Sequence, residues 1–162
     1  MAISEGEQIP EVELRTMGPD GPQAISSREA LGSGKVVLFA VPGAFTPTCS
    51  DYHLPGYVLR AEELSAAGAD KVACVSVNDA FVMSAWGESR QVGDKVQMLA
   101  DGNGDFARAM GLDRDASGNG MGVRSRRYAA IIDDGVVTHL AVEDRGLDVS
   151  SADSILKALS AP

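Results

Sequence analysis

The stretch KVVLFAVPGAFTPTC, from Lys35 to Cys49, joins an apolar run to a proline-rich turn that ends in a cysteine. The run as far as Val41 is almost continuously apolar, which is typical of a strand buried on both faces of a parallel sheet. Thr46 is a good helix N-cap and Pro47 is favoured at the first helical position, so a helix is expected to begin there. The stretch therefore predicts a central strand that passes directly into a helix.

Short apolar runs alternate with helical patterns along the rest of the chain. Such alternation predicts parallel strands in one sheet with helices on both faces. The order of elements is compatible with an α/β, thioredoxin-like fold, in which a central mixed sheet is flanked by helices and carries an N-terminal hairpin extension. One domain over residues 1–162 is expected. The other predicted elements are a hairpin around 18–22, strands over 71–77 and 96–101, helices over 48–67, 78–90, 104–111 and 150–159, a loop over 111–122, and a hairpin over 128–142 that turns at Asp134-Gly135.

Two of the predicted helices have local features beyond their periodicity. Pro55 lies inside the helical pattern of residues 48–67 and predicts a kink. The helix predicted over 78–90 begins at good N-caps. One of its faces is expected to pack on the core, and it carries Phe81, Val82, Ala85 and Trp86.

The formal net charge of −9 makes nucleic acids unexpected partners, because phosphate binding depends on clustered basic residues. The basic residues cluster only at Arg124–Tyr128, which favours local site chemistry. The chain has no apolar run of about 18 residues, so no membrane span is predicted. The N-terminal residues show neither a secretory signal nor an organelle transit pattern, so a cytoplasmic location is expected.

Metal and cofactor sites are not predicted. The chain has two histidines and no C-x-x-C pair, which is too little for a typical zinc site. The run DRDASGNGMGVR, from Asp113 to Arg124, resembles the first half of a calcium-binding loop. Its twelfth position should hold a bidentate glutamate, and Arg124 stands there instead. A flexible loop is therefore expected over these residues.

Cys49 falls in the first turn of the helix that begins after Thr46. Unpaired backbone N–H groups and the positive end of the helix dipole favour a thiolate there. The Thr46 hydroxyl lies within one turn and is expected to reach the sulfur. His53 follows on the same face; it could act as a general base, although packing or hydrogen bonding beside the site is its more ordinary role. A buried, inert Cys49 is the alternative.

Cys74 stands in the middle of the strand predicted over 71–77, between apolar residues. Free cysteines are among the most buried residues, so an unreactive thiol is expected at this position. Two cysteines and no C-x-x-C pair argue against a disulfide framework.

These segments together resemble one protein family. The segment PGAFTPTC fits the peroxiredoxin pattern P-x-x-x-T/S-x-x-C, and its extended form is similar to mammalian peroxiredoxin-five and plant type II peroxiredoxins. The resemblance extends in order over CVSVNDAFVMSAWG (Cys74–Gly87), LADGNGDFARAMGL (Leu99–Leu112) and RSRRYAAIIDDGVV (Arg124–Val137).

The resemblance implies a thiol peroxidase that reduces hydrogen peroxide and alkyl hydroperoxides. It makes Cys49 the peroxidatic cysteine, which would become a sulfenic acid. It assigns Thr46 to hydrogen bonding with the sulfur and the peroxide, and Pro42 to shielding of the sulfenic acid. The active-site arginine of the family aligns best with Arg127, and Arg126 is the alternative.

The resemblance also bears on the return of the enzyme to its reduced form. Mammalian members have a resolving cysteine where this chain has Val149. Cys74 is a possible secondary thiol, as in plant type II members, but its expected place in a strand is poor for resolution. An external thiol is therefore expected, either glutathione with glutaredoxin or thioredoxin. The family implies a homodimer, with Phe45 and Phe81 as candidate interface residues.

Two other functions fit a reactive thiol. A thiol-disulfide oxidoreductase would need a C-x-x-C pair, and Thr46 stands where its first cysteine would be. A chaperone or a redox-signalling protein would pass oxidation to a partner without peroxidase turnover. Fast consumption of hydrogen peroxide with a thiol reductant distinguishes a peroxidase from both.

Overall fold

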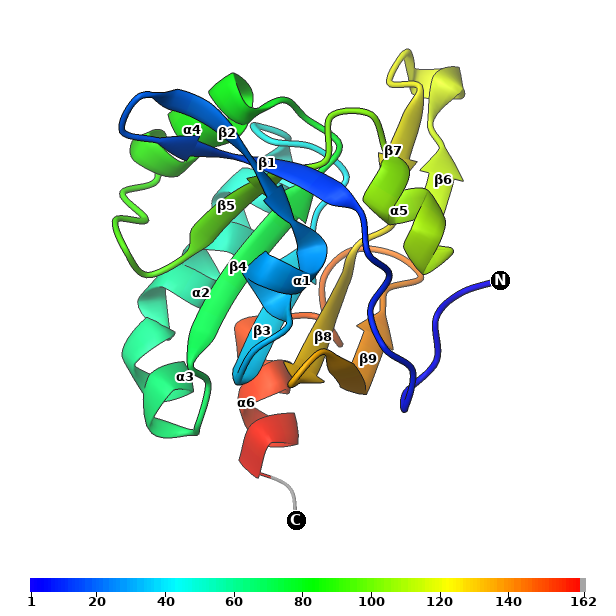
Figure 1. Ribbon diagram of the computed structural model, residues 1–162. Helices are drawn as coiled ribbons and strands as arrows, with labels where there is room; N and C mark the ends of the chain where they lie inside the picture. The colour runs from blue at the N-terminus through cyan, green and yellow to red at the C-terminus, as the bar shows by residue number, and fades with distance from the viewer. Residues whose placement is uncertain (161–162) are drawn as a thin grey trace.

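The computed structural model describes residues 1–160, and a seven-stranded mixed sheet runs through its middle (Figure 1). The strand order is β2-β1-β5-β4-β3-β8-β9. The neighbours β3, β4 and β5 are parallel, and the other neighbouring pairs are antiparallel. The predicted α/β, thioredoxin-like architecture with a central mixed sheet is confirmed. The strands are β1 (Glu13–Gly18), β2 (Gly21–Ser26), β3 (Lys35–Ala40), β4 (Lys71–Ser76), β5 (Gln97–Ala100), β8 (Tyr128–Asp133) and β9 (Val136–Val142).

The strand predicted from the opening stretch, β3, lies in the interior of the sheet between β4 and β8. Its side chains alternate between two apolar clusters, one on each face of the sheet. Val37 and Phe39 belong to one cluster, and Val36 and Leu38 belong to the other. Burial on both faces explains why the run is continuously apolar.

The helices cover both faces of the sheet (Figure 1). The face that contains Phe39 is covered by side chains of α2, α3, α4 and α6, and the opposite face by those of α1 and α5. None of the described helices is long and apolar enough to cross a membrane. The helices are α1 (Ser27–Leu31), α2 (Leu54–Leu59), α3 (Ala61–Ala66), α4 (Ala80–Ser89), α5 (Asp105–Met110) and α6 (Ala152–Ser160).

Both predicted hairpins are confirmed. The N-terminal hairpin joins β1 to β2, with Gly18 paired to Gly21 beside its turn. The other hairpin joins β8 to β9 through Asp134 and Gly135, whose φ angles are 47° and 85°. Two successive positive φ angles are those of a type I′ turn, which the Asp-Gly pair predicts.

The helix predicted over residues 48–67 is wrong as a single element. The structure has a π-helical turn over Cys49–His53, then α2, and then α3 after a break at Arg60. Pro55 supplies the physical reason for the wide turn. It lacks an N–H for the carbonyl of Asp51, and its ring would clash with that carbonyl in a regular helix. The predicted kink therefore takes the form of a π turn that precedes the proline.

The predicted core face of the 78–90 helix is partly wrong. Trp86 is fully buried as predicted, but the Phe81 side chain is 66% exposed. Asp79 caps α4 by accepting a hydrogen bond from the Val82 N–H, so the helix begins at Ala80. The buried positions are then Ala80, Met83, Trp86 and Gly87, which lie on one side of the helix.

The glycine-rich segment after α5 is more ordered than the predicted loop. It forms a small antiparallel pair, β6 (Asp113–Asp115) with β7 (Val123–Ser125), and a 3₁₀ turn over Ser117–Asn119. Helix α1 was also missed, although Ser26 caps it by accepting a hydrogen bond from the Glu29 N–H. Both omissions concern elements of five residues or fewer, in which periodicity carries little information.

Candidate active site

The cysteine turn and the arginine cluster meet at one edge of the sheet. The turn follows the carboxyl end of β3, and Arg127 immediately precedes β8. The two strands are antiparallel neighbours, with Ala40 paired to Tyr128. The end of β3 and the beginning of β8 therefore lie together, as expected for a site at the carboxyl end of a central strand.

Cys49 lies in the first turn of its helix, and its side chain is fully buried. Helical structure begins at Pro47, and the Ser50 N–H donates to the Thr46 carbonyl. Thr46 therefore precedes the helix, Pro47 is its first residue and Cys49 is its third, as predicted. This placement puts the sulfur near the N–H groups at the positive end of the helix.

The Arg127 guanidinium links Cys49 to His53. Its Nη2 donates to the Cys49 sulfur at 3.1 Å, and its Nη1 donates to His53 Nδ1 at 2.8 Å. The side chain of Arg126 makes no hydrogen bond or ion pair within residues 1–160, and its hydrogen bonds are made by the backbone, with Leu112 and Ser125. Of the two arginines considered from the sequence, Arg127 is the one beside the sulfur.

His53 is neutral, with a defined tautomer. A guanidinium can only donate, so His53 Nδ1 must be the acceptor of the bond from Arg127. The proton is then on Nε2, which donates to the Ser150 carbonyl at 3.0 Å. Burial, followed by the charge of Arg127, lowers the pKa of His53 to about 3. Both ring nitrogens are occupied, so the geometry supports a role in orienting Arg127 rather than general-base catalysis.

The Ser150 carbonyl accepts a second buried hydrogen bond, from the Tyr57 hydroxyl at 2.7 Å. The Tyr57 ring stacks on Phe39 of β3, with 4.0 Å between ring centroids and 4° between planes. The His53 ring also lies beside Phe39, at 5.0 Å between centroids. These rings exclude water from one side of the site and hold the histidine in place.

The predicted hydrogen bond from the Thr46 hydroxyl to the Cys49 sulfur is not formed. The hydroxyl donates instead to the Gly43 carbonyl at 2.7 Å. A hydroxyl has one proton, and a carbonyl oxygen three residues back in the turn is a good acceptor for it. The lone pairs of the Thr46 oxygen remain available to accept a hydrogen bond.

Two residues that the sequence analysis did not select hold the turn before Cys49. Arg124 Nη1 donates to the Val77 and Pro42 carbonyls, at 3.3 Å and 3.5 Å. Asn78 Oδ1 accepts from the Ala44 N–H at 3.0 Å. Pro42 is thereby fixed, half-buried, at the start of the turn. The basic cluster was the signal that could have identified Arg124.

Trp86 holds the cysteine turn from the other side. Its indole N–H donates to the Ser50 hydroxyl at 2.9 Å, and both side chains are buried. The chain contains one tryptophan. Its fluorescence is therefore a reporter for changes next to Cys49.

Cys74 lies in the middle of β4 and is fully buried, as predicted. It pairs with Phe39 of β3 on one side and with Met98 of β5 on the other. Burial, and then the negative charge of an ionised Cys49, raise the pKa of the Cys74 thiol well above its ordinary value. Cys74 is therefore held as a neutral thiol. Within the described residues, no group of three His, Cys, Asp or Glu side chains could hold a metal ion.

Comparisons with known proteins place the whole chain among similar sequences and structures. The Redoxin family model matches residues 4–156. Peroxiredoxin-2E-2, chloroplastic, from Oryza sativa subsp. japonica is 52% identical, over 97% of this chain and 72% of the relative. Peroxiredoxin-2B from Arabidopsis thaliana is 46% identical, over 97% of this chain and 98% of the relative. The crystal structure of reduced Prx3 in complex with H2O2 from Vibrio vulnificus superposes with a TM-score of 0.94, at 50% identity, covering 98% of this chain and 99% of that one.

Proposed function

Because the chain belongs to the peroxiredoxin family of thiol peroxidases, we propose that it reduces hydrogen peroxide and alkyl hydroperoxides through a sulfenic acid on Cys49. The observation that carries this assignment is the contact of 3.1 Å between Arg127 Nη2 and the Cys49 sulfur. A permanent cation beside a sulfur at a helix start stabilises a thiolate, which is the nucleophilic form of cysteine. The structure of Vibrio vulnificus Prx3 with H2O2 supports hydrogen peroxide as a substrate.

The first step transfers one oxygen atom to the sulfur. The Cys49 thiolate attacks one peroxide oxygen, an S–O bond forms and the O–O bond breaks. The sulfur is oxidised by two electrons to the sulfenic acid, and the leaving oxygen takes up a proton as water or an alcohol. Negative charge grows on the leaving oxygen, so fixed donors stabilise the transition state more than the ground state.

Three residues around Cys49 are assigned to this step. Arg127 stabilises the thiolate and donates to the peroxide. The Thr46 oxygen, whose proton is held by Gly43, can accept a hydrogen bond from the peroxide O–H. The half-buried Pro42 is assigned to shielding of the sulfenic acid. Arg127 and Thr46 together would orient the two peroxide oxygens relative to the sulfur.

The cycle is completed by an external thiol, from glutathione with glutaredoxin or from thioredoxin. The thiol condenses with the sulfenic acid to a mixed disulfide and water, and a second thiol releases Cys49 and forms a disulfide. The Cys49 sulfur is fully buried, so the turn over Cys49–His53 must open before the reductant reaches it. A cytoplasmic location is proposed with this reductant, because glutathione there keeps both free cysteines reduced.

Replacement of Cys74 with serine tests the choice of an external reductant. Turnover with glutathione and glutaredoxin is expected to stay within about twofold of wild type, because a thiol buried in the middle of β4 takes no part in resolution. Steady-state peroxide consumption is compared for glutaredoxin and thioredoxin, with Cys74→Ala as a second variant that buries no hydroxyl. Loss of turnover in both variants would show that Cys74 resolves the sulfenic acid.

We also propose that the protein is a homodimer with Phe45 and Phe81 in its interface. Both rings are largely exposed, at 53% and 66% of their surface. The hydrogen bond between the Ala44 N–H and Asn78 brings the Phe45 turn near the start of α4, which carries Phe81. Phe45 also has a φ of 66°, which is costly for an aromatic residue.

Sedimentation equilibrium tests the dimer. Phe81→Asp is expected to shift the protein toward monomer at micromolar concentration, because burial of an unpaired charge opposes association. Tyr52→Asp makes the same kind of change at a side chain that is 67% exposed on the π turn, and is expected to leave the dimer intact. A monomeric wild type, or equal behaviour of the two variants, would contradict this interface.

A further inference from the structure

Buried hydrogen bonds continue from the active site to the segment 143–150, which connects β9 to α6. The centre of this segment is the carboxylate of Glu143, a residue that is buried. A single oxygen, Oε2, accepts from the Asp148 N–H at 2.7 Å, the Ser150 N–H at 2.8 Å and the Ser150 hydroxyl at 2.7 Å. These bonds close the segment into a compact loop around the carboxylate.

The loop determines where the Ser150 carbonyl points. Because Glu143 holds both the N–H and the hydroxyl of Ser150, the peptide unit that follows has little freedom to rotate. Its carbonyl oxygen accepts hydrogen bonds from the Nε2–H group of His53 and from the Tyr57 hydroxyl. A carbonyl has two lone pairs, so both buried donors are satisfied by this one oxygen.

The carbonyl in turn determines the form of His53. With the proton held on Nε2, Nδ1 presents a lone pair to Arg127 Nη1 at 2.8 Å. The other guanidinium nitrogen is then left facing the Cys49 sulfur. Glu143 also holds the same arginine directly, because its backbone N–H donates to the Arg127 carbonyl at 2.9 Å.

We propose that Glu143 is a positioning residue for the peroxidase reaction, which acts through Ser150 and His53 on the guanidinium of Arg127. The proposal rests on the catalytic role assigned to Arg127 above. Burial by itself would raise the pKa of Glu143, but the hydrogen bonds from Asp148 and Ser150 outweigh burial and lower it. The side chain is therefore an ionised acceptor, which is the form that the three bonds require.

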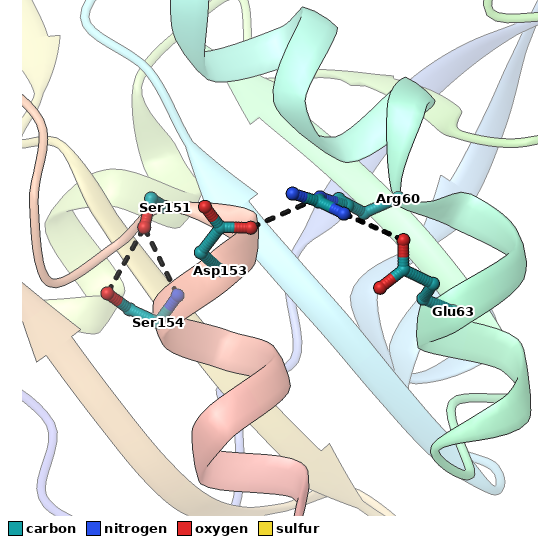
Figure 2. Close-up of polar contacts among 5 residues, drawn as sticks. All are labelled: Arg60, Glu63, Ser151, Asp153 and Ser154. Atoms are coloured by element: carbon teal, nitrogen blue, oxygen red, sulfur yellow. Dashed lines mark hydrogen bonds and ion pairs between the residues drawn. The ribbon is translucent and has the colours of Figure 1, made fainter.

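Contacts at the start of α6, next to this segment, supply a matched control (Figure 2). Ser151 caps α6 by accepting a hydrogen bond from the Ser154 N–H at 3.2 Å. The neighbouring Asp153 forms an ion pair with Arg60 at 3.2 Å, and their side chains are 68% and 39% exposed. Exposed ion pairs contribute little to stability. Asp153→Asn therefore removes a carboxylate near Ser150 without disturbing the Glu143 bonds.

The experiment measures how fast hydrogen peroxide oxidises Cys49, by stopped-flow fluorescence of Trp86. Glu143→Leu, which removes the acceptors, is expected to slow oxidation about tenfold, the scale of a lost hydrogen bond to a charged group. Glu143→Gln, which keeps a carbonyl oxygen, is expected to recover most of the rate. Asp153→Asn is expected to match wild type.

In an Arg127→Gln background, Glu143→Leu is expected to cause no further slowing, because both residues act through one guanidinium.

The possible results distinguish the catalytic role of Arg127 from the positioning role of Glu143. If Arg127→Gln alone keeps the wild-type rate, the catalytic role of Arg127 fails. If Arg127→Gln is slow and Glu143→Leu is harmless, or slows both backgrounds equally, only the positioning role of Glu143 is overturned.

Thermal unfolding of each variant checks folding. If Glu143→Leu does not fold, Ser150→Ala takes its place. It removes one of the three donors and is expected to slow oxidation about threefold in the wild-type background alone; an unchanged rate overturns the proposal.

Discussion

Replacement of Cys49 with serine is expected to reduce peroxide consumption to the uncatalysed rate. The sulfur is the atom that accepts the peroxide oxygen, and a serine hydroxyl is neither ionised near neutral pH nor a comparable nucleophile. Arg127 would still point at the substituted side chain, so the loss would report the missing thiolate rather than a missing contact. Consumption of hydrogen peroxide with glutathione and glutaredoxin provides the measurement.

The other cysteine provides the control for this substitution. Cys74→Ser makes the same chemical change at an equally buried position, but outside the arginine contact. If Cys49 is the nucleophile, only its own replacement removes activity. A Cys49→Ser protein that consumed peroxide at a rate comparable to that of Cys74→Ser would show that another group reacts first.

Replacement of Arg127 with glutamine is expected to slow oxidation of Cys49 by about 10²- to 10³-fold, the usual cost of removing one preorganised donor from a transition state. The change removes the permanent charge beside the sulfur and the fork that spans His53 and Cys49. Arg127→Lys is expected to recover part of the rate, because it restores a charge without the planar fork. The second-order rate constant with hydrogen peroxide is the quantity to compare.

Arg126→Gln is the matched control for the arginine. It changes the adjacent residue, whose side chain has no hydrogen bond or ion pair in the described part of the chain. Its rate is expected to equal that of wild type. Equal loss in the two glutamine variants would mean that the net charge of the cluster matters rather than the contact made by Arg127.

Much of the fold could be predicted from the sequence because its central strands β3, β4 and β8 are buried on both faces. A run such as Lys35–Ala40 has no polar face, and the alternation of such runs with helices restricts the topology to a few choices. The Asp134-Gly135 turn was predictable for a local reason, since its two positive φ angles suit those residues. Phe81 was misplaced because the most apolar residues were taken as the buried stripe of the helix, whereas the fold buries the side that carries Ala80, Met83, Trp86 and Gly87.

The candidate site was predictable where its chemistry is local. The order of Thr46, Pro47 and Cys49 placed the cysteine at a helix start, and this pattern alone left a reactive and an inert thiol both open. Arg127 was identified through the family resemblance, because no pattern of spacing connects residues that the sheet brings together from distant segments. The Thr46 hydroxyl was expected to donate to the sulfur, but it donates to the Gly43 carbonyl, a contact that depends on how the turn folds.

The part of the site that could not be predicted consists of buried contacts made by ordinary residues. Glu143 and Ser150 belong to no motif, and their importance depends on a loop that folds around one carboxylate oxygen. The role of His53 was left open for the same reason. Its tautomer is decided by the guanidinium of Arg127 and the carbonyl of Ser150, which only the folded chain brings together.

Trapping of the sulfenic acid is the most direct test of Cys49 as the peroxidatic residue. The reduced protein is treated with one equivalent of hydrogen peroxide in the presence of dimedone, which labels sulfenic acids, and the labelled peptide is identified by mass spectrometry. We predict that the label is found on Cys49, and that it is much reduced in Arg127→Gln at the same short reaction time. A label on Cys74 instead, or rapid peroxide loss with no label on Cys49, would contradict the assignment.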